Sequence, residues 1–140
     1  MTRIKYTSQN VQTIAFFEQL THANLRDSID DEQSGMLYFV VEPGEMGKAI
    51  GKNASNLRTL EEKLNRKIKI VEFDPEVLKF IANLSYPVRP SGMKESGGTV
   101  IITPPDLNSR GVLIGRGGSN LRAMERVAKR YFKITEIKVA

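Results

Sequence analysis

Two short glycine-containing segments combine the residue types that could bind a phosphate group. One spans residues 51–54 and reads G-K-N-A, and the other spans residues 115–118 and reads G-R-G-G. Because glycine has no side chain, the backbone N–H groups of such a turn can come close to a phosphodiester. Lys52 and Arg116 stand at the second position of each segment, where each side chain can add a charged contact. The two segments are therefore candidate binding sites for a polyanion.

Both segments belong to a longer internal repeat. Residues 47–61 align with residues 111–125 without a gap, at a shift of 64 positions, and eight of the fifteen residues are identical. Unrelated stretches of average composition would share about one residue in fifteen. The chain therefore contains an internal duplication. A period of 64 residues suits two copies of a small domain better than a solenoid.

The composition excludes several classes of protein. The chain has 140 residues, 40% of them hydrophobic, which is enough apolar material for a packed core. It has no cysteine and a single histidine, His22, so disulfides, thiol catalysis and multi-histidine metal sites are excluded. No apolar stretch approaches the ~20 residues that cross a bilayer. We expect a cytoplasmic protein with no membrane association, no catalytic residues, no metal and no other cofactor.

The positive charge is concentrated in the two copies of the repeat. The formal net charge of the chain is +5, and residues 44–73 and 106–140 contribute +3 and +5 of it. Residues 1–43 carry −3, and residues 74–105 are neutral. Positive charge at two defined places indicates two sites for a polyanion rather than a generally adhesive surface.

Residue patterns predict the same order of elements in each copy. For the first copy the predicted elements are a helix at 8–22, strands at 25–29 and 36–41, a short helix at 47–50, the glycine turn at 51–54, a helix with Leu57, Leu60 and Leu64 on one face, and a strand at 67–73. The second copy follows without a linker. Asp74 is predicted to cap a helix that begins at Pro75 and buries Val77, Leu78, Phe80, Ile81 and Leu84.

The rest of the second copy repeats the pattern of the first. Residues 86–98 are predicted to form an irregular strand and a mobile turn, and residues 99–103 a strand. Asp106 is expected to cap a short helix that leads to the glycine turn at 115–118. The inward positions of the following helix are predicted to be Leu121, Met124, Val127, Ala128 and Tyr131, and the last strand is predicted at 133–139.

This element order, with G-x-x-G between two helices, resembles the type II (prokaryotic) KH domain. Residues 114–118 match the Ile-Gly-x-x-Gly signature, and residues 50–54 match it except that Ala54 replaces the last glycine. Two fused units of this kind are similar to the archaeal NusA-like transcription termination/antitermination factors. The resemblance implies an α+β fold of two tandem type II KH domains, residues 1–73 and 74–140. Each domain would have a three-stranded sheet covered by helices on one face.

The resemblance also implies a function in transcription. A monomer would hold nascent single-stranded RNA through both turns, contact RNA polymerase, and modulate termination or elongation. A duplex hides the faces and the Watson–Crick edges of its bases, so single strands are favoured. Bases are expected to lie on aliphatic side chains of the strands at 36–41 and 99–103. The expected RNA-binding residues are Lys48, Gly51, Lys52, Asn53, Ala54, Gly115, Arg116, Gly117, Gly118 and Arg122.

Other interpretations remain open at this point. A KH protein could instead associate with ribosomal or precursor RNA, since type II KH units also occur there. A nucleotide-binding enzyme is a third reading, because residues 115–120 begin like G-x-G-x-x-G, but Asn120 stands where the third glycine belongs. Both glycine turns could also be mere helix connectors.

Three sets of residues near the turns have structural interpretations. Helix capping explains the recurring pairs Ser55 with Asn56 and Ser119 with Asn120 at least as well as contact with RNA does. The basic residues Arg122, Arg126 and Lys129 form a stripe without matching acids, suited to phosphate contact or to solubility. His22 is expected at the surface, at a helix end.

Overall fold

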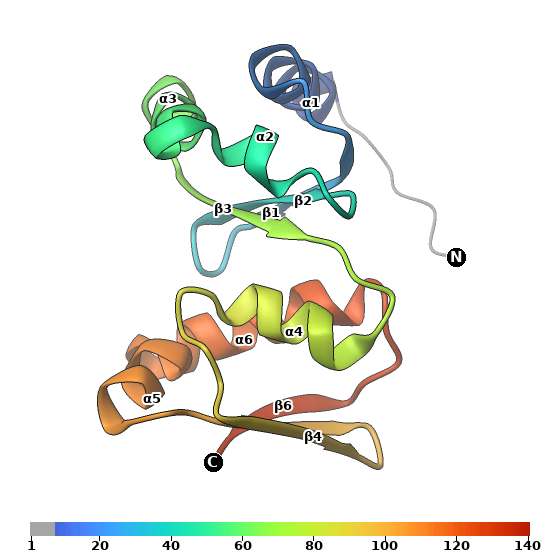
Figure 1. Cartoon of the computed structure of the whole chain (residues 1–140), viewed down its shortest axis with the longest axis vertical. Helices are drawn as coiled ribbons and strands as arrows, with labels where there is room; N and C mark the ends of the chain where they lie inside the picture. The colour runs from blue at the N-terminus through green and yellow to red at the C-terminus, as the bar shows by residue number, and fades with distance from the viewer. Residues whose placement is uncertain (1–7) are drawn as a thin grey trace. The chain divides into compact units, whose positions relative to one another are not determined.

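The computed structural model describes residues 8–140, and the chain divides into two compact units between Asp74 and Pro75. Both units are α+β and repeat one order of elements (Figure 1). The first unit consists of α1 (Ser8–Thr21), β1 (Leu25–Asp31), β2 (Met36–Val41), α2 (Met46–Ile50), the 3-10 turn η1 (Lys52–Ala54), α3 (Ser55–Leu64) and β3 (Lys67–Glu72). The second consists of α4 (Val77–Ser85), β4 (Gly92–Ser96), β5 (Thr99–Thr103), α5 (Leu107–Ile114), η2 (Arg116–Gly118), α6 (Ser119–Lys129) and β6 (Glu136–Val139).

Each unit contains a three-stranded sheet with one antiparallel and one parallel pair. The strand orders are β1-β2-β3 and β4-β5-β6, and in each sheet the central strand pairs antiparallel with the first strand and parallel with the last. A parallel pair needs a crossover connection, because the chain must return to the starting end of the sheet. That crossover is α2-η1-α3 in the first unit and α5-η2-α6 in the second. The glycine turns therefore lie in the middle of the crossovers.

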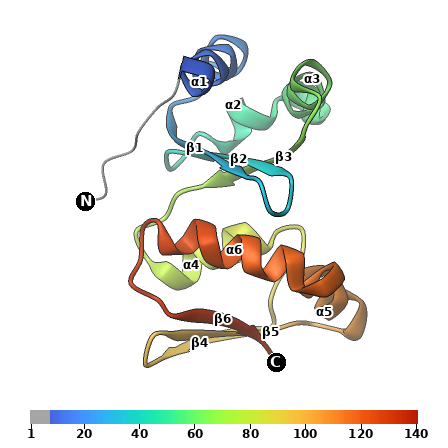
Figure 2. The same cartoon turned by 180° about the vertical axis from the view of Figure 1, so that it is seen from behind.

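The helices of each unit, taken by itself, cover one face of its sheet (Figures 1 and 2). In the first unit Phe17 of α1 stacks on Phe39 of β2, with ring centroids 4.4 Å apart. Leu60 of α3 is fully buried in the same core, as the leucine spacing predicts. Leu57 and Leu64 are half-buried against it.

The core of the second unit confirms most of the predicted inward positions. Phe80, Ile81 and Leu84 of α4 are fully buried, whereas Val77 and Leu78 are half-buried. Tyr131 follows the end of α6 and meets the Phe80 ring edge to face, with centroids 5.5 Å apart. Buried α6 side chains comprise Leu121, Met124, Val127 and Ala128, as the pattern predicts.

The central strands bury most of their apolar side chains. Leu37, Phe39 and Val41 of β2 belong to the first core, and Val100 and Ile102 of β5 are fully buried. For these five side chains the expected contact with bases is wrong, because the core already covers them. Met36 and Ile101 are half-buried, and for them the expectation stays a prediction.

One of the two predicted N-terminal helix caps is observed, and the other is not. Asp106 caps α5, since its Oδ1 accepts a hydrogen bond from Ser109 N at 2.6 Å, and this bond lowers the pKa of the Asp106 carboxyl. Asp74 does not cap α4. The cap position is Glu76, in an extended conformation without a side-chain hydrogen bond, so the helix begins two residues after Pro75. His22 is exposed directly after α1, as expected.

Candidate nucleic-acid interface

The two glycine turns have the same backbone conformation. The first position has φ 78° and ψ 170° at Gly51 and φ 73° and ψ 175° at Gly115. The third position is left-handed in both turns, with φ 56° at Asn53 and φ 62° at Gly117. The sequence repeat is therefore also a repeat of local geometry, although the third residue differs between the copies.

The first position of each turn has no room for a side chain. A Cβ on Gly51 would lie 2.9 Å from Cγ of Asn56, and a Cβ on Gly115 would lie 2.8 Å from Cβ of Asn120. Such contacts are too short for carbon atoms, so glycine is required here for packing as well as for its positive φ. A Cβ at Gly117 would meet nothing within 4 Å.

The fourth position differs between the copies and is left-handed in both. Ala54 has φ 59° and ψ 28°, and Gly118 has φ 78° and ψ 11°. A Cβ on Gly118 would meet nothing within 4 Å, so the space around this position accepts a methyl group. The left-handed backbone does not accept it freely, because an L-residue there costs about 1–2 kcal/mol. The first turn keeps the conformation despite this strain.

Exchanging the fourth residues is expected to shift the stability of the fold in opposite directions. Ala54→Gly should raise the free energy of unfolding by about 1 kcal/mol, since relief of strain exceeds the added chain entropy of glycine. Gly118→Ala should lower it by a similar amount, about 1 kcal/mol. Urea unfolding of the two variants and the wild type measures both shifts. Shifts of the same sign would contradict the strain assignment.

Each turn opens directly into a longer helix whose first turn has no side-chain cap. The cap positions of α3 and α6 are Ala54 and Gly118, and at neither helix does a capping side chain accept a hydrogen bond from the backbone N–H groups, so the predicted capping by the Ser-Asn pairs is wrong. Asn56 Nδ2 instead donates to Lys48 O at 2.9 Å. Asn120 Nδ2 donates to Val112 O at 3.0 Å and to Leu113 O at 3.1 Å.

The asparagines point backward because of their place in the helix. The cap positions are Ala54 and Gly118, so Asn56 and Asn120 are the second residues of α3 and α6. From there the amide reaches the last carbonyls of the preceding helix, which lack partners within that helix. The asparagines thus tie the two helices together across the turn. The first-turn N–H groups keep the positive end of the helix dipole open to an anion.

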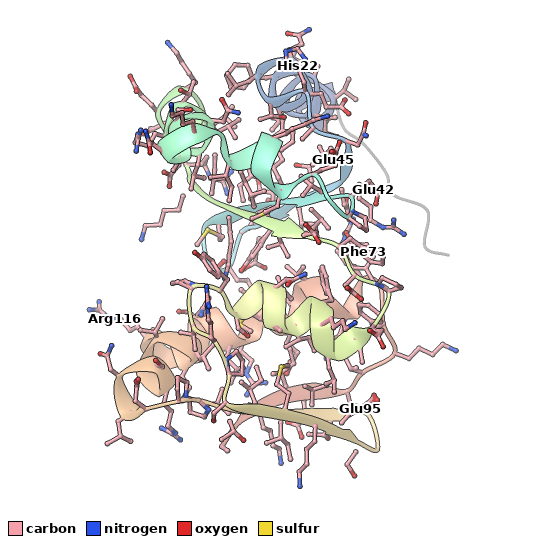
Figure 3. The ribbon with its side chains drawn as sticks, viewed as in Figure 1. His22, Glu42, Glu45, Phe73, Glu95 and Arg116 are labelled. Carbon is pink, nitrogen blue, oxygen red and sulfur yellow. The ribbon has the colours of Figure 1, made fainter. Side chains whose placement is uncertain are left out.

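Most predicted contact residues lie on the surface around these helix starts. Lys48, Lys52 and Asn53 are exposed in the first unit, and Arg116 and Gly117 in the second. Figure 3 shows the Arg116 side chain on the outer side of its turn. The half-buried members of the predicted set are Gly51, Ala54, Gly115 and Gly118. The structure thus gathers the first five predicted residues around one turn and the last five around the other.

Arg122 has an acidic partner, which corrects the prediction of an unmatched basic stripe. Its Nη1 lies 2.8 Å from Glu125 Oε2, and Lys129 Nζ lies 3.7 Å from Glu125 Oε1. Residues three and four apart on a helix share one face, so Glu125 reaches both cations. Glu125 is only 9% exposed and also accepts a hydrogen bond from Ile137 N at 2.9 Å. This carboxylate therefore fixes α6 to β6, and Arg122 offers RNA less free charge than Arg116 does.

Other kinds of site find no support within residues 8–140. No group of three His, Cys, Asp or Glu side chains in this range could hold a metal ion. No helix in the same range combines the length and the apolar character that crossing a bilayer requires.

Comparison with known proteins places the chain in a family. No protein-family model matches it. "Probable transcription termination protein NusA" of Methanocaldococcus jannaschii is 32% identical over 145 residues, covering 99% of this chain and 76% of that protein. The protein of the same name from Halobacterium salinarum is 33% identical over 138 residues, covering 97% and 98%. A solved structure titled "Crystal structure of APE1850" matches with a TM-score of 0.76 and 27% identity, covering 96% of this chain and 100% of that one. With relatives of this similarity along nearly its whole length, the chain belongs to the archaeal NusA-like family.

Proposed function

We propose that this protein holds nascent single-stranded RNA through two tandem type II KH domains, residues 1–73 and 74–140, and thereby modulates transcription termination or elongation. It acts as a cytoplasmic monomer that contacts RNA polymerase. The contact residues are those gathered around the two turns. Its relatives are named as transcription termination proteins and not as enzymes, which supports a role in transcription.

The observation that carries this proposal is the shared conformation of the two turns. The two copies repeat φ and ψ closely at the first, third and fourth positions of the turn. The first copy does so with two successive non-glycine residues, Asn53 and Ala54, at positive φ. Backbone strain that persists at an exposed turn is typical of functional sites. A conformation that aims N–H groups at a phosphate supplies the reason for keeping it.

The helix that follows each turn and the nearby charges complete the argument for RNA. The uncapped first turns of α3 and α6 attract anions. Exposed Lys52 and Arg116 add cations at the same two places. A G-x-x-G turn that clamps about four nucleotides of backbone is the mode by which KH domains bind single strands. Because most apolar side chains of the central strands are buried, backbone contacts contribute a large part of the affinity.

Salt and strand state test this function. Binding of a single-stranded RNA should weaken with salt, with a log–log slope of about 0.7 for each phosphate neutralised. Duplex RNA of the same length should bind less tightly, because its backbone cannot enter both turns in the required conformation. Fluorescence anisotropy across a series of salt concentrations gives both results. Equal affinity for the two forms at physiological salt would overturn the proposal.

A crosslinking experiment in cells tests the assignment to transcription. Ultraviolet crosslinking and recovery of the bound RNA should yield nascent transcripts associated with RNA polymerase. Recovery of ribosomal or precursor RNA alone would support the second function, binding to those RNAs.

A further inference from the structure

One pair of equivalent residues beside the turns differs in chemistry. Residues 48 and 112 each lie three positions before the first glycine of a turn. Both backbone carbonyls accept a hydrogen bond from the asparagine after the turn, Lys48 O from Asn56 and Val112 O from Asn120. These bonds fix the two residues in the same place relative to their turns. The first unit has an ammonium group there, and the second has an aliphatic side chain.

Both side chains are accessible to a ligand. The Lys48 side chain is 63% exposed, and its Nζ lies 3.8 Å from Glu45 Oε2, at the long end of the range for an ion pair. Val112 is 49% exposed. Removing apolar surface from water is favourable, so a ligand with an apolar face would gain binding free energy by covering the exposed Val112 side chain.

The second unit shows exposed apolar surface beside its turn. Helix α5 carries Leu107, which is 87% exposed, as well as Val112. A Cβ on Gly111 would meet nothing within 4 Å, so the helix backbone between them is open to a ligand. Two nearby arginines already have partners, since Arg110 Nε donates to Ala140 O at 3.1 Å and Arg122 pairs with Glu125.

We infer that the two units contact different parts of one RNA strand, and that residues 48 and 112 decide the difference. Lys48 of the first unit adds a phosphate contact, so this unit holds RNA whatever its bases. Val112 of the second unit packs on the face of a nucleobase, so this unit requires a base. This inference rests on the proposed function and adds a division of labour between its two sites.

The physical argument is a contrast between two kinds of contact. An ammonium group binds phosphate through charge, releases counterions and is sensitive to salt. An aliphatic side chain binds the face of a base by removing apolar surface from water, which depends little on salt. Both turns share the same backbone conformation, so the shared N–H contacts do not distinguish the units. The side chain beside each turn then decides what is bound in addition.

An abasic RNA separates the two contributions in the full-length chain. Asn53→Asp disables the first turn, so RNA binding by N53D measures the second unit. Gly117→Asp disables the second turn, so RNA binding by G117D measures the first unit. The probes are a uridine octamer and an octamer of the same ribose-phosphate backbone without bases. The N53D protein should lose about tenfold in affinity when the bases are removed, because the apolar surface that Val112 and the base face bury together is then lost. The G117D protein should lose less than about threefold. Equal losses in the two variants would overturn the inference.

Reciprocal substitution of the two residues gives a second test. Lys48→Val should reduce the log–log salt slope of RNA binding by about 0.7, and Val112→Lys should increase it by about 0.7. Lys63→Val is the matched control, because Lys63 lies in the last turn of α3, away from the glycine turn, and its removal changes the charge equally. If K48V and K63V change the slope equally, residue 48 makes no specific phosphate contact and the inference fails.

Failure of this inference is distinguishable from failure of the proposed function. The double variant N53D/G117D should lose RNA binding if the turns are the binding sites at all. If the double variant binds RNA like the wild type, the proposed function itself is wrong. If it loses binding while the abasic octamer affects both single variants equally, only the division of labour is wrong.

Discussion

Replacing Gly117 with aspartate is expected to reduce the affinity for single-stranded RNA about tenfold or more. The carboxylate would stand where a phosphate must approach the N–H groups of the turn. Repulsion and a lost charged contact together are worth about 1–3 kcal/mol, and each 1.4 kcal/mol is about tenfold in affinity. The melting temperature should fall only by the strain of an L-residue at φ 62°, about 1 kcal/mol of stability, because Gly117 is exposed and a Cβ there meets nothing within 4 Å. Anisotropy titration and thermal unfolding measure the two quantities.

The chain supplies its own control for this substitution. Asn53 occupies the equivalent position of the first turn with φ 56°, so asparagine fits this backbone. Gly117→Asn therefore changes the size of the side chain as Gly117→Asp does but adds no charge. G117N should retain most of the RNA affinity. Asn53→Asp should show a loss in the first unit similar to that of G117D in the second. Equal affinities for G117D and G117N would show that no phosphate lies at this position.

The second large effect is expected from the length of the RNA. If each unit binds about four nucleotides, a tetramer engages one turn at a time. A strand long enough to reach both turns should bind about a hundredfold more tightly or better, because the second contact becomes intramolecular. Only four residues separate the end of β3 at Glu72 from the start of α4 at Val77, so a short tether joins the two units. Titration with strands of four to sixteen nucleotides should show this gain as a step.

Two variants test whether that step comes from joint binding. N53D and G117D each leave a single working turn, so neither should show the step. A ten-residue Gly/Ser insertion between Phe73 and Asp74 should lower the affinity for the long strand, because effective concentration falls as a tether lengthens. Tetramer binding should not change. A step that persists in the single-turn variants would mean that length acts through something other than two joined sites.

Strands with strong local patterns were predictable from sequence. The strand predictions at 36–41 and 99–103 agree with β2 and β5 to the residue, because runs of β-formers are bounded there by Pro-Gly and Pro-Pro. The last strand is shorter than the predicted 133–139 and begins at Glu136. In the predicted segment the buried isoleucines are Ile134, which lies before the strand, and Ile137, which lies in it; their spacing of three residues breaks the alternation that a strand requires.

Elements whose ends depend on tertiary partners were less predictable. The strand predicted at 25–29 continues to Asp31, although aspartate is a poor strand former. Asp30 pairs with Arg66 on a distant segment at 2.7 Å, and the Asp31 carboxylate accepts a hydrogen bond from Ser34 N at 3.1 Å. These partners lie up to 36 residues away in sequence and offset the low propensity.

In the candidate site, too, the features set by local sequence were predictable and those set by tertiary contacts were not. The position and form of the turns followed from the repeat and its glycines. The direction of the asparagine side chains did not, because a Ser-Asn pair at a helix start is equally compatible with capping. The ion pair between Arg122 and Glu125 was not predicted either, because whether the two side chains meet depends on their rotamers. The recurrence of Asn56 and Asn120 in both copies was the one feature that could have indicated their structural role.

The open space around Gly117 and the exposure of Asn53 also make the two turns convenient for spectroscopy. The chain has no cysteine, so a cysteine introduced at either position would be its single thiol. Asn53 demonstrates that a side chain is accepted in this backbone, and nothing lies within 4 Å of a Cβ at Gly117. Nitroxide or fluorescent labels on N53C and G117C would place one reporter at each turn. Pulsed electron resonance or energy transfer between them would then follow, in solution, how far apart the turns lie before and after a ligand arrives.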